Sequence, residues 1–191
     1  MCKYYAGIGS RKTPPKIIEK FKDLAEQLAK LGYCLRSGGA EGADTAFELG
    51  CDRVEGKKQI FLPWKGFVNN QSPFFEPPPE AFKIAEKFHP GWKGLGQGAK
   101  RLHARNSQQV LGPELNDPVD FVVCYTSEHK GGTLQALRVA YCHRIPVFNF
   151  IKGDYSFRGI LRRVYEDKCC KRRTEELYHG LQTMRTRKEE R

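Results

Sequence analysis

The stretch Ser37-Gly38-Gly39-Ala40-Glu41-Gly42-Ala43-Asp44 narrows the fold more than any other part of the sequence. It follows a short apolar run at 33–36, typical of a buried strand, and precedes a helical pattern over 43–54. Three glycines within five positions allow a sharp turn and let a ligand approach the backbone closely. A helix that begins there directs unpaired N–H groups and a partial positive charge at the loop, which suits a phosphate. We therefore predict a strand, a phosphate-binding loop and a helix; a turn that serves only strand–helix packing is the alternative.

Strand and helix patterns alternate along the rest of the chain. Apolar strand runs are expected at 3–8, 33–36, 58–62, 120–125 and 145–150. Amphipathic helices are expected after the first, second and fourth of these runs. Apolar strands separated by helices indicate a parallel sheet that is covered on both faces. The predicted fold class is α/β, a Rossmann-like open, mainly parallel five-stranded sheet whose ligands bind beyond the carboxyl ends of the strands.

Residues 64–118 form a long segment between the third and fourth strands. The segment holds both tryptophans and the run Pro77-Pro78-Pro79, with helices expected at 79–88 and 99–111. We interpret it as a helical insertion that leans over the ligand edge of the sheet, where some of its aromatic side chains could stack a base. The domain division that we expect is a Rossmann domain over 1–167, including this cap, and a basic C-terminal helix or tail over 168–191.

Composition limits the function classes. The chain has 191 residues, of which 39% are hydrophobic and 29% charged, as expected of one soluble globular domain. No apolar run approaches the roughly 20 residues that span a bilayer, so no membrane partner is expected. Seven cysteines without a Cys-x-x-Cys pair indicate a reducing, cytoplasmic location and no metal site. The net charge of +11 is partly concentrated over 158–191, a stretch that is a solvated amphipathic helix or, alternatively, a nucleic-acid patch.

Three motifs, in order at the ends of expected strands, resemble the SLOG superfamily. They are YAGIGSR from Tyr4, LRSGGAEGAD from Leu35 and GGTLQALRVA from Gly131. This superfamily includes the DprA/Smf DNA-processing proteins, the LOG nucleotide phosphoribohydrolases and nucleotide-sensing domains of prokaryotic defence systems. Together with LPWKGF at Leu62 and ARNSQQVLG at Ala104, the motifs look most like the small DprA-like proteins of bacteriophages.

The resemblance implies that the glycine loops bind the phosphate and ribose of a nucleotide. Ser10 would supply a hydroxyl and Arg11 a guanidinium suited to bidentate phosphate contact. In the insertion, helical spacing places Leu102, Arg105, Asn106 and Gln109 on adjoining faces. This side of the helix faces either the glycine loops or, alternatively, the surface or a dimer interface. The candidate ligand-binding residues are Gly9, Ser10, Arg11, Ser37, Gly38, Gly39, Gly42, Asp44, Arg105, Asn106, Gly131, Gly132 and Thr133. We expect no cofactor and no metal.

The motifs leave open whether the protein is an enzyme. LOG enzymes carry Pro-Gly-Gly-x-Gly-Thr-x-x-Glu, and here Ala136 stands in the place of the glutamate. This argues against LOG-type cleavage, although Glu41 or Asp44 could supply a carboxylate. The resulting hypotheses are a non-catalytic binder of a phosphorylated nucleotide-derived small molecule, an N-glycosidase acting on a nucleotide or NAD-like substrate, and a DprA-like protein that binds single-stranded DNA.

Two further expectations concern self-association and the glycine loop. The resemblance implies a homo-oligomer, for which Leu134, Leu137, Val139 and the helix at 99–111 offer apolar side chains. We also expect Gly39→Leu to abolish ligand binding and leave the fold intact, on the premise that a side chain there meets the ligand and not the core.

Overall fold

The computed structural model describes residues 3–126 and 132–166. The chain divides into two compact units, Met1–Asp154 and Tyr155–Arg191. The described part of the second unit contains a helix over 157–166. Gly131 and the predicted tail over 168–191 lie outside the described residues.

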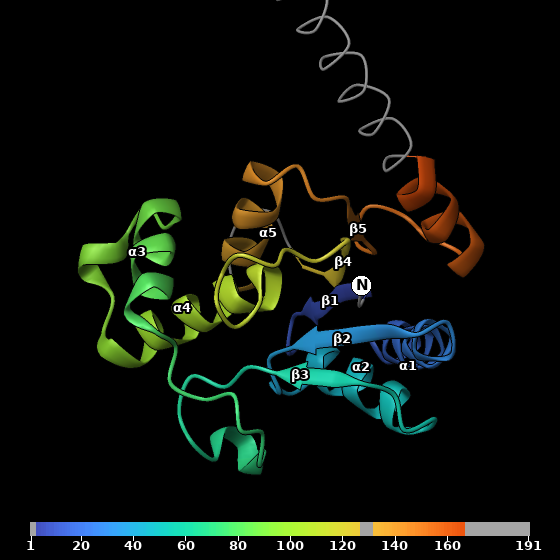
Figure 1. Cartoon of the computed structure of the whole chain (residues 1–191), viewed down its shortest axis with the longest axis horizontal. Helices are drawn as coiled ribbons and strands as arrows, with labels where there is room; N and C mark the ends of the chain where they lie inside the picture. The colour runs from blue at the N-terminus through green and yellow to red at the C-terminus, as the bar shows by residue number, and fades with distance from the viewer. Residues whose placement is uncertain (1–2, 127–131, 167–191) are drawn as a thin grey trace, which may run out of the picture. The chain divides into compact units, whose positions relative to one another are not determined.

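The first unit is built on one sheet of five parallel strands in the order β3-β2-β1-β4-β5 (Figure 1). The order confirms the predicted Rossmann-like class, and every strand pair is parallel. The strands are β1 (Lys3–Gly9), β2 (Tyr33–Ser37), β3 (Lys58–Ile60), β4 (Phe121–Tyr125) and β5 (Val147–Asn149). The helices are α1 (Pro15–Lys30), α2 (Ala43–Asp52), η1 (Phe67–Asn69), α3 (Pro79–Phe88), η2 (Trp92–Gly94), α4 (Gln97–Leu111) and α5 (Gly132–Cys142).

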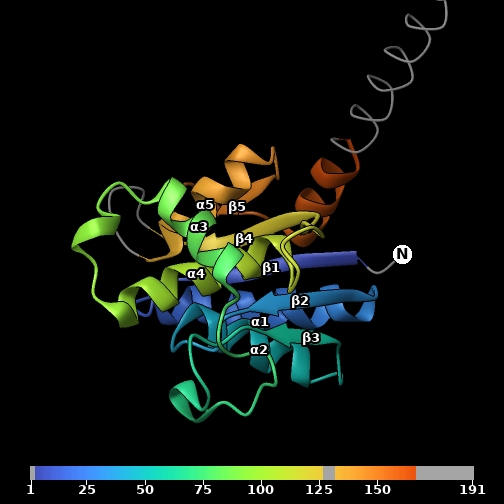
Figure 2. The same ribbon diagram turned by 60° about the vertical axis from the view of Figure 1, so that its left-hand side comes forward.

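Helices α1 and α2 cover one face of the sheet, and α4 and α5 cover the other (Figures 1 and 2). Alternate residues of β1 point to the two faces, as the period of a strand requires. Tyr5 stacks on Phe121 on the α1–α2 side, whereas Ala6 and Ile8 join the core cluster that α5 supplies. Gly7 faces α2, and a Cβ there would lie 2.5 Å from the ring of Phe47.

The packing of α5 against the sheet contradicts one prediction from the sequence, the surface proposed for self-association. Leu137 and Val139, predicted to offer apolar surface for self-association, have no exposed surface because they pack in the monomer core. The last two turns of α4 are also buried. These side chains are therefore not available to a second copy of the chain.

The first and last strands in the order of the sheet, β3 and β5, are at least two residues shorter than predicted. β3 ends at Ile60 because the Leu62 N–H donates to the Phe74 carbonyl, which draws the chain away from the sheet. β5 covers only Val147–Asn149 of the predicted 145–150. Both are edge strands, and short edge strands limit unwanted pairing with other chains.

The long segment between β3 and β4 has two roles. Helix α4 is the crossover that lies against the sheet, and α3 packs on α4 and α5. Trp92 packs with Ala81, Ala85 and Ala104 in a small separate core, so this tryptophan is a packing residue. Among the described residues, no helix combines the length and apolar character that a membrane crossing requires.

A histidine pair joins the end of α3 to α4. The rings of His89 and His103 are 4.4 Å apart, and the Nδ1 of His103 is buried without a hydrogen-bond partner in the described chain. Burial, with the nearby positive charges, lowers the pKa of His103 to about 4 from an ordinary 6.5. Because the unfolded chain binds this proton more readily, the stabilising contribution is present above about pH 6.5 and lost as the pH falls toward 4.

We therefore expect the wild-type protein to lose more stability between pH 7 and pH 4.5 than a His103→Gln variant. The measurement is urea unfolding at both pH values. His143→Gln, which alters an exposed histidine, is the matched control and should behave like the wild type. Equal pH dependence of wild type and His103→Gln would show that His103 titrates normally.

Candidate functional site

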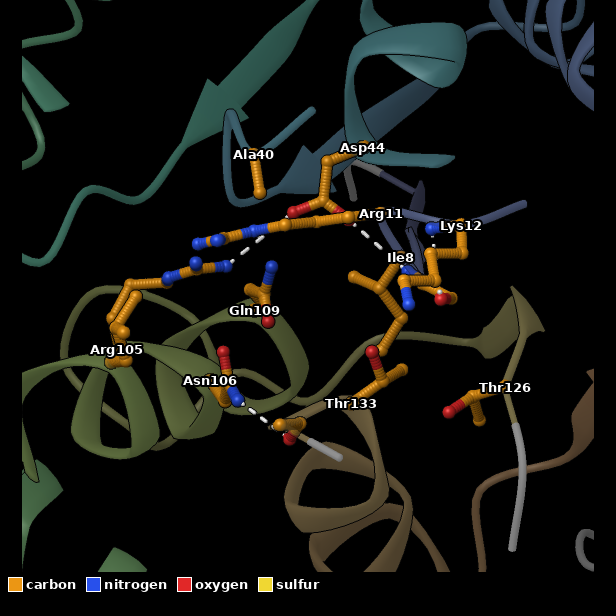
Figure 3. A pocket seen from close by; sticks show the side chains of 14 residues that line it. Ile8, Arg11, Lys12, Ala40, Asp44, Arg105, Asn106, Gln109, Thr126 and Thr133 are labelled. Atoms are coloured by element: carbon orange, nitrogen blue, oxygen red, sulfur yellow. Dashed lines mark hydrogen bonds and ion pairs between the residues drawn. The ribbon is translucent and has the colours of Figure 1, made fainter. Parts of the chain in front are cut away.

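The strongest candidate site lies at the topological switch point of the sheet. The chain leaves β1 toward β2 and leaves β4 toward β5, on opposite sides, and β1 and β4 are neighbours. Ligands of open α/β sheets bind at such a point. A cavity of about 570 Å³ opens there, within the size range of small-molecule sites. It is lined by Ile8, Gly9, Ser10, Arg11, Lys12, Ala40, Asp44, Leu102, Arg105, Asn106, Gln109, Thr126, Gly132 and Thr133 (Figure 3).

Asp44, in the first turn of α2, joins the loop after β1 to that helix. Its Oδ1 accepts a hydrogen bond of 3.1 Å from the Gly9 N–H, and its Oδ2 lies 3.5 Å from Nη1 of Arg105. Burial raises the pKa of Asp44, while Arg105 and the backbone N–H groups oppose that rise. With both carboxylate oxygens engaged, Asp44 holds the loops and the arginine in place.

Arg105 projects from α4 into the pocket and is almost completely buried. Its guanidinium lies 5.9 Å from the ring centroid of Phe67, which is also buried. Burial lowers the pKa of Arg105, Asp44 opposes this, and the charge of Arg11 lowers it further. Nε of Arg105 has no hydrogen-bond partner among the described residues.

A relay of side-chain amides fixes Arg105 and connects the three loops. In the amide orientation that satisfies its neighbours, the Gln109 oxygen accepts from Nη1 of Arg105 at 2.7 Å and from the Gly38 N–H at 3.0 Å. The Gln109 nitrogen donates to Oδ1 of Asn106 at 3.1 Å. Nδ2 of Asn106 donates to the Gly132 carbonyl at 2.8 Å. Polar side chains of α4 thereby connect the loop after β2 to the start of α5.

The glycines of the central loop have packing roles. A Cβ on Gly38 would lie 1.5 Å from Nη1 of Arg105. Gly39 has a φ of +64°, and a Cβ there would lie 3.1 Å from Ile60 and Leu62, so the expected neutrality of Gly39→Leu toward folding is wrong. Gly42 has a φ of +87°, and a Cβ there would lie 2.6 Å from the Ser10 carbonyl.

The N-terminus of α2 is not open to an anion in the way the sequence suggests. The Ala43 N–H donates to the Ser10 carbonyl at 3.3 Å, and the Asp44 carboxylate occupies the first turn. The helix whose start lines the pocket is instead α5, through Gly132 and Thr133. A helix N-terminus favours negative charge, so this end of α5 adds to the positive character of the pocket.

Eight of the thirteen candidate residues line one cavity, and four lie outside the lining. The lining set is Gly9, Ser10, Arg11, Asp44, Arg105, Asn106, Gly132 and Thr133. The structure places Ser37, Gly38, Gly39 and Gly42 in contacts that support the pocket from behind. Arg105 and Asn106 face the loops, which decides between the two orientations that the sequence left open.

Six lining residues were not among the candidates. Helical spacing already places Gln109 and Leu102 beside Arg105 and Asn106 in the sequence, and the structure shows that both line the pocket. Lys12 adjoins Arg11. Ile8, Ala40 and Thr126 end or follow strands and carry no sequence signal of their own.

The pocket has the chemistry of an anion site. Arg11, Lys12 and Arg105 contribute positive charge, and Asp44 is the one carboxylate in its described lining. Arg11 and Lys12 are exposed, and Arg11 extends across the pocket toward Arg105 (Figure 3). Across residues 3–126 and 132–166, no group of three or more His, Cys, Asp or Glu side chains could hold a metal ion.

The fold of the chain is similar to that of DNA processing protein A. Its structure superposes on that protein from Helicobacter pylori with a TM-score of 0.57 and 18% identity, over 87% of this chain and 81% of that one. DprA from Streptococcus pneumoniae matches with a TM-score of 0.52 and 18% identity, over 77% of this chain and 49% of that one. This confirms, at the level of fold, the resemblance drawn from the motifs. No protein-family model and no curated protein matches the sequence.

Proposed function

We propose that the protein binds a phosphorylated, nucleotide-derived small molecule in the switch-point pocket. The observation that carries the proposal is the convergence of Arg11 and Arg105 on one cavity at the ligand edge of a Rossmann-like sheet. The cavity is large enough for a nucleotide, and guanidinium groups suit phosphate oxygens. Sequestration of a signalling nucleotide of host defence is the use that we infer from the likeness to phage DprA-like proteins.

The described pocket lining favours binding over cleavage. Glu41 is absent from the lining, and Asp44 already accepts hydrogen bonds from Gly9 and Arg105. A general acid or base must reach a proton of the substrate, which an engaged structural carboxylate does poorly. We therefore place N-glycosidic cleavage second to simple binding.

Single-stranded DNA is a second candidate ligand, because the Helicobacter pylori protein of the same fold binds it. The net charge of +11 would favour a polyanion. The described lining contains no aromatic ring on which a base could stack, so this pocket alone is a poor strand-binding groove.

Arg11→Ala is expected to weaken nucleotide binding by roughly ten- to a hundredfold, since a hydrogen bond to a charged group contributes about 1.5–3 kcal/mol. Arg11 is exposed, so the melting temperature should not change. The measurement is calorimetric titration of a panel of nucleoside mono-, di- and triphosphates. Arg101→Ala removes an equal charge from an exposed position of α4 outside the pocket and is the control.

If a nucleotide binds wild type, Arg11→Ala and Arg101→Ala equally well, the ligand occupies another site. If Arg101→Ala weakens binding as much as Arg11→Ala does, the attraction is a property of the whole charged surface and not of this pocket.

A further inference from the structure

The charges around the pocket are unbalanced in its described lining. Three cationic side chains, Arg11, Lys12 and Arg105, face one carboxylate, that of Asp44, which leaves an excess of two positive charges. Both oxygens of this carboxylate already accept hydrogen bonds, one from the Gly9 N–H and one from Arg105. The excess must be balanced by whatever enters the pocket.

Arg105 also has a hydrogen-bond donor that no described residue accepts. Its side chain is 5% exposed, its Nη1 serves Gln109 and Asp44, and its Nε has no partner in the described chain. Buried charged groups are stable in proteins when their hydrogen bonds are satisfied. The unpartnered N–H therefore indicates an acceptor that residues 3–126 and 132–166 do not supply.

Arg11 brings a second cation toward the first. Burial is the main cause of the lowered pKa of Arg105, and the charge of Arg11 lowers it further. Two guanidinium groups repel each other unless an anion lies between them. The exposed Arg11 and the buried Arg105 can then bind different oxygens of the same group (Figure 3).

We propose that the pocket selects a terminal phosphate monoester, which carries two negative charges, over a phosphodiester, which carries one. This inference rests on the proposed function and names the ligand class of the same site. A monoester has a charge of about −1.5 to −2 at pH 7 and three acceptor oxygens. It therefore matches the excess charge, and its oxygens suit Nε of Arg105, the Arg11 fork and the Thr133 hydroxyl.

The same charge balance predicts how a nucleic acid would bind in this pocket. An internal phosphate of a strand is a diester and leaves one positive charge unbalanced. A strand would then bind through a phosphorylated end, and the preference for a small nucleotide over DNA follows from charge alone.

The test compares two ligands that share a nucleoside and differ in phosphate charge. Adenosine 5′-monophosphate and adenosine 3′,5′-cyclic monophosphate, and the same pair with guanosine, are titrated calorimetrically at pH 7.5. The monoester should bind at least tenfold more tightly, and Arg11→Gln should reduce this ratio to below threefold. Equal binding of the two esters, or tighter binding of the cyclic one, overturns the inference and leaves the proposed function standing. Binding of neither ester in the millimolar range contradicts both.

The pH dependence provides a second, independent readout. The second pKa of a phosphate monoester is about 6, so its affinity should fall about tenfold between pH 7.5 and pH 5. The titratable and charged protein groups that face the phosphate are Arg11, Lys12, Asp44 and Arg105. Protonation of Asp44, whose pKa burial raises, would change the affinity for both esters. A parallel loss for monoester and cyclic ester therefore overturns the inference, and a loss confined to the monoester supports it.

Tetrathymidylate with and without a 5′-phosphate shows whether the pocket binds the phosphorylated end of a strand or its internal phosphodiesters. Tighter binding of the phosphorylated strand, at the affinity of the mononucleotide, supports recognition of a strand end. Equal binding of the two strands, at an affinity above that of the mononucleotide, shows diester recognition and overturns the inference.

Discussion

Gly38→Ala is expected to weaken nucleotide binding about a hundredfold or more while the protein remains folded. The new Cβ would lie 1.5 Å from Nη1 of Arg105 and 2.4 Å from its Cζ, so the guanidinium must leave its position. Its bond to Gln109 is then lost, and with it the connection to Asn106 and the start of α5. A hundredfold change corresponds to about 2.7 kcal/mol, within the range of charged hydrogen bonds.

The cost to folding should be about 1–3 kcal/mol, which leaves the protein folded, because the displaced atoms are the end of a long side chain and not backbone. Calorimetric titration and urea unfolding separate the two effects. Gly98→Ala is the matched control, since a Cβ on Gly98 of α4 meets nothing within 4 Å. It should leave binding unchanged. Full affinity in Gly38→Ala would show that Arg105 is not a ligand contact.

Arg36→Met is expected to lower the free energy of unfolding by about 1.5–3 kcal/mol, the scale of hydrogen bonds to a charged group, because the carboxylate left behind, that of Asp117, is half-exposed. Arg36, in β2, is completely buried. Its Nε donates to Gln59 at 2.7 Å, its Nη2 lies 2.7 Å from Asp117 Oδ2, and its Nη1 donates to the Asp117 carbonyl.

The surroundings of Arg36 offer methionine no equivalent contacts. The guanidinium lies 3.8 Å from the ring centroid of Tyr4, and Gly112 leaves the space that it occupies. Arg53→Met is the control, because exposed ion pairs such as those of Arg53 with Asp23 and Glu26 contribute little to stability. A loss in Arg36→Met no larger than in Arg53→Met, measured by urea unfolding, would contradict a structural role for this residue.

The fold was predictable because its signals are local and repeated. β1, β2 and β4 are continuous apolar runs, and each ends at small or polar residues. α3 was predicted with its observed bounds because the prolines before it fix its first turn. The edge strand β3 was predicted too long because apolar character continues to Leu62, which pairs with the segment at Phe74 and not with the sheet. β5 was predicted too long because the apolar run extends beyond Val147–Asn149 at both ends.

The candidate site was predictable in its location but not in its chemistry. Loops that follow strands of a parallel sheet meet at one edge, which brings Arg11 and Thr133 to the same cavity. The sequence could not show that Gly38, Gly39 and Gly42 accommodate protein atoms, since a glycine that admits a ligand and a glycine that admits an arginine have the same sequence signal. The relay through Gln109 depends on the rotation of α4 about its axis, which only the packed helix defines.

A crystal structure of the protein soaked with adenosine 5′-monophosphate, and with guanosine 5′-monophosphate, tests the central claim most directly. We expect the phosphate of a bound nucleotide within hydrogen-bond distance of Arg105 Nε and of the Arg11 guanidinium, at the start of α5 and between the ends of β1 and β4. A nucleotide bound away from this cavity, or one whose base and not its phosphate meets Arg105, would contradict it.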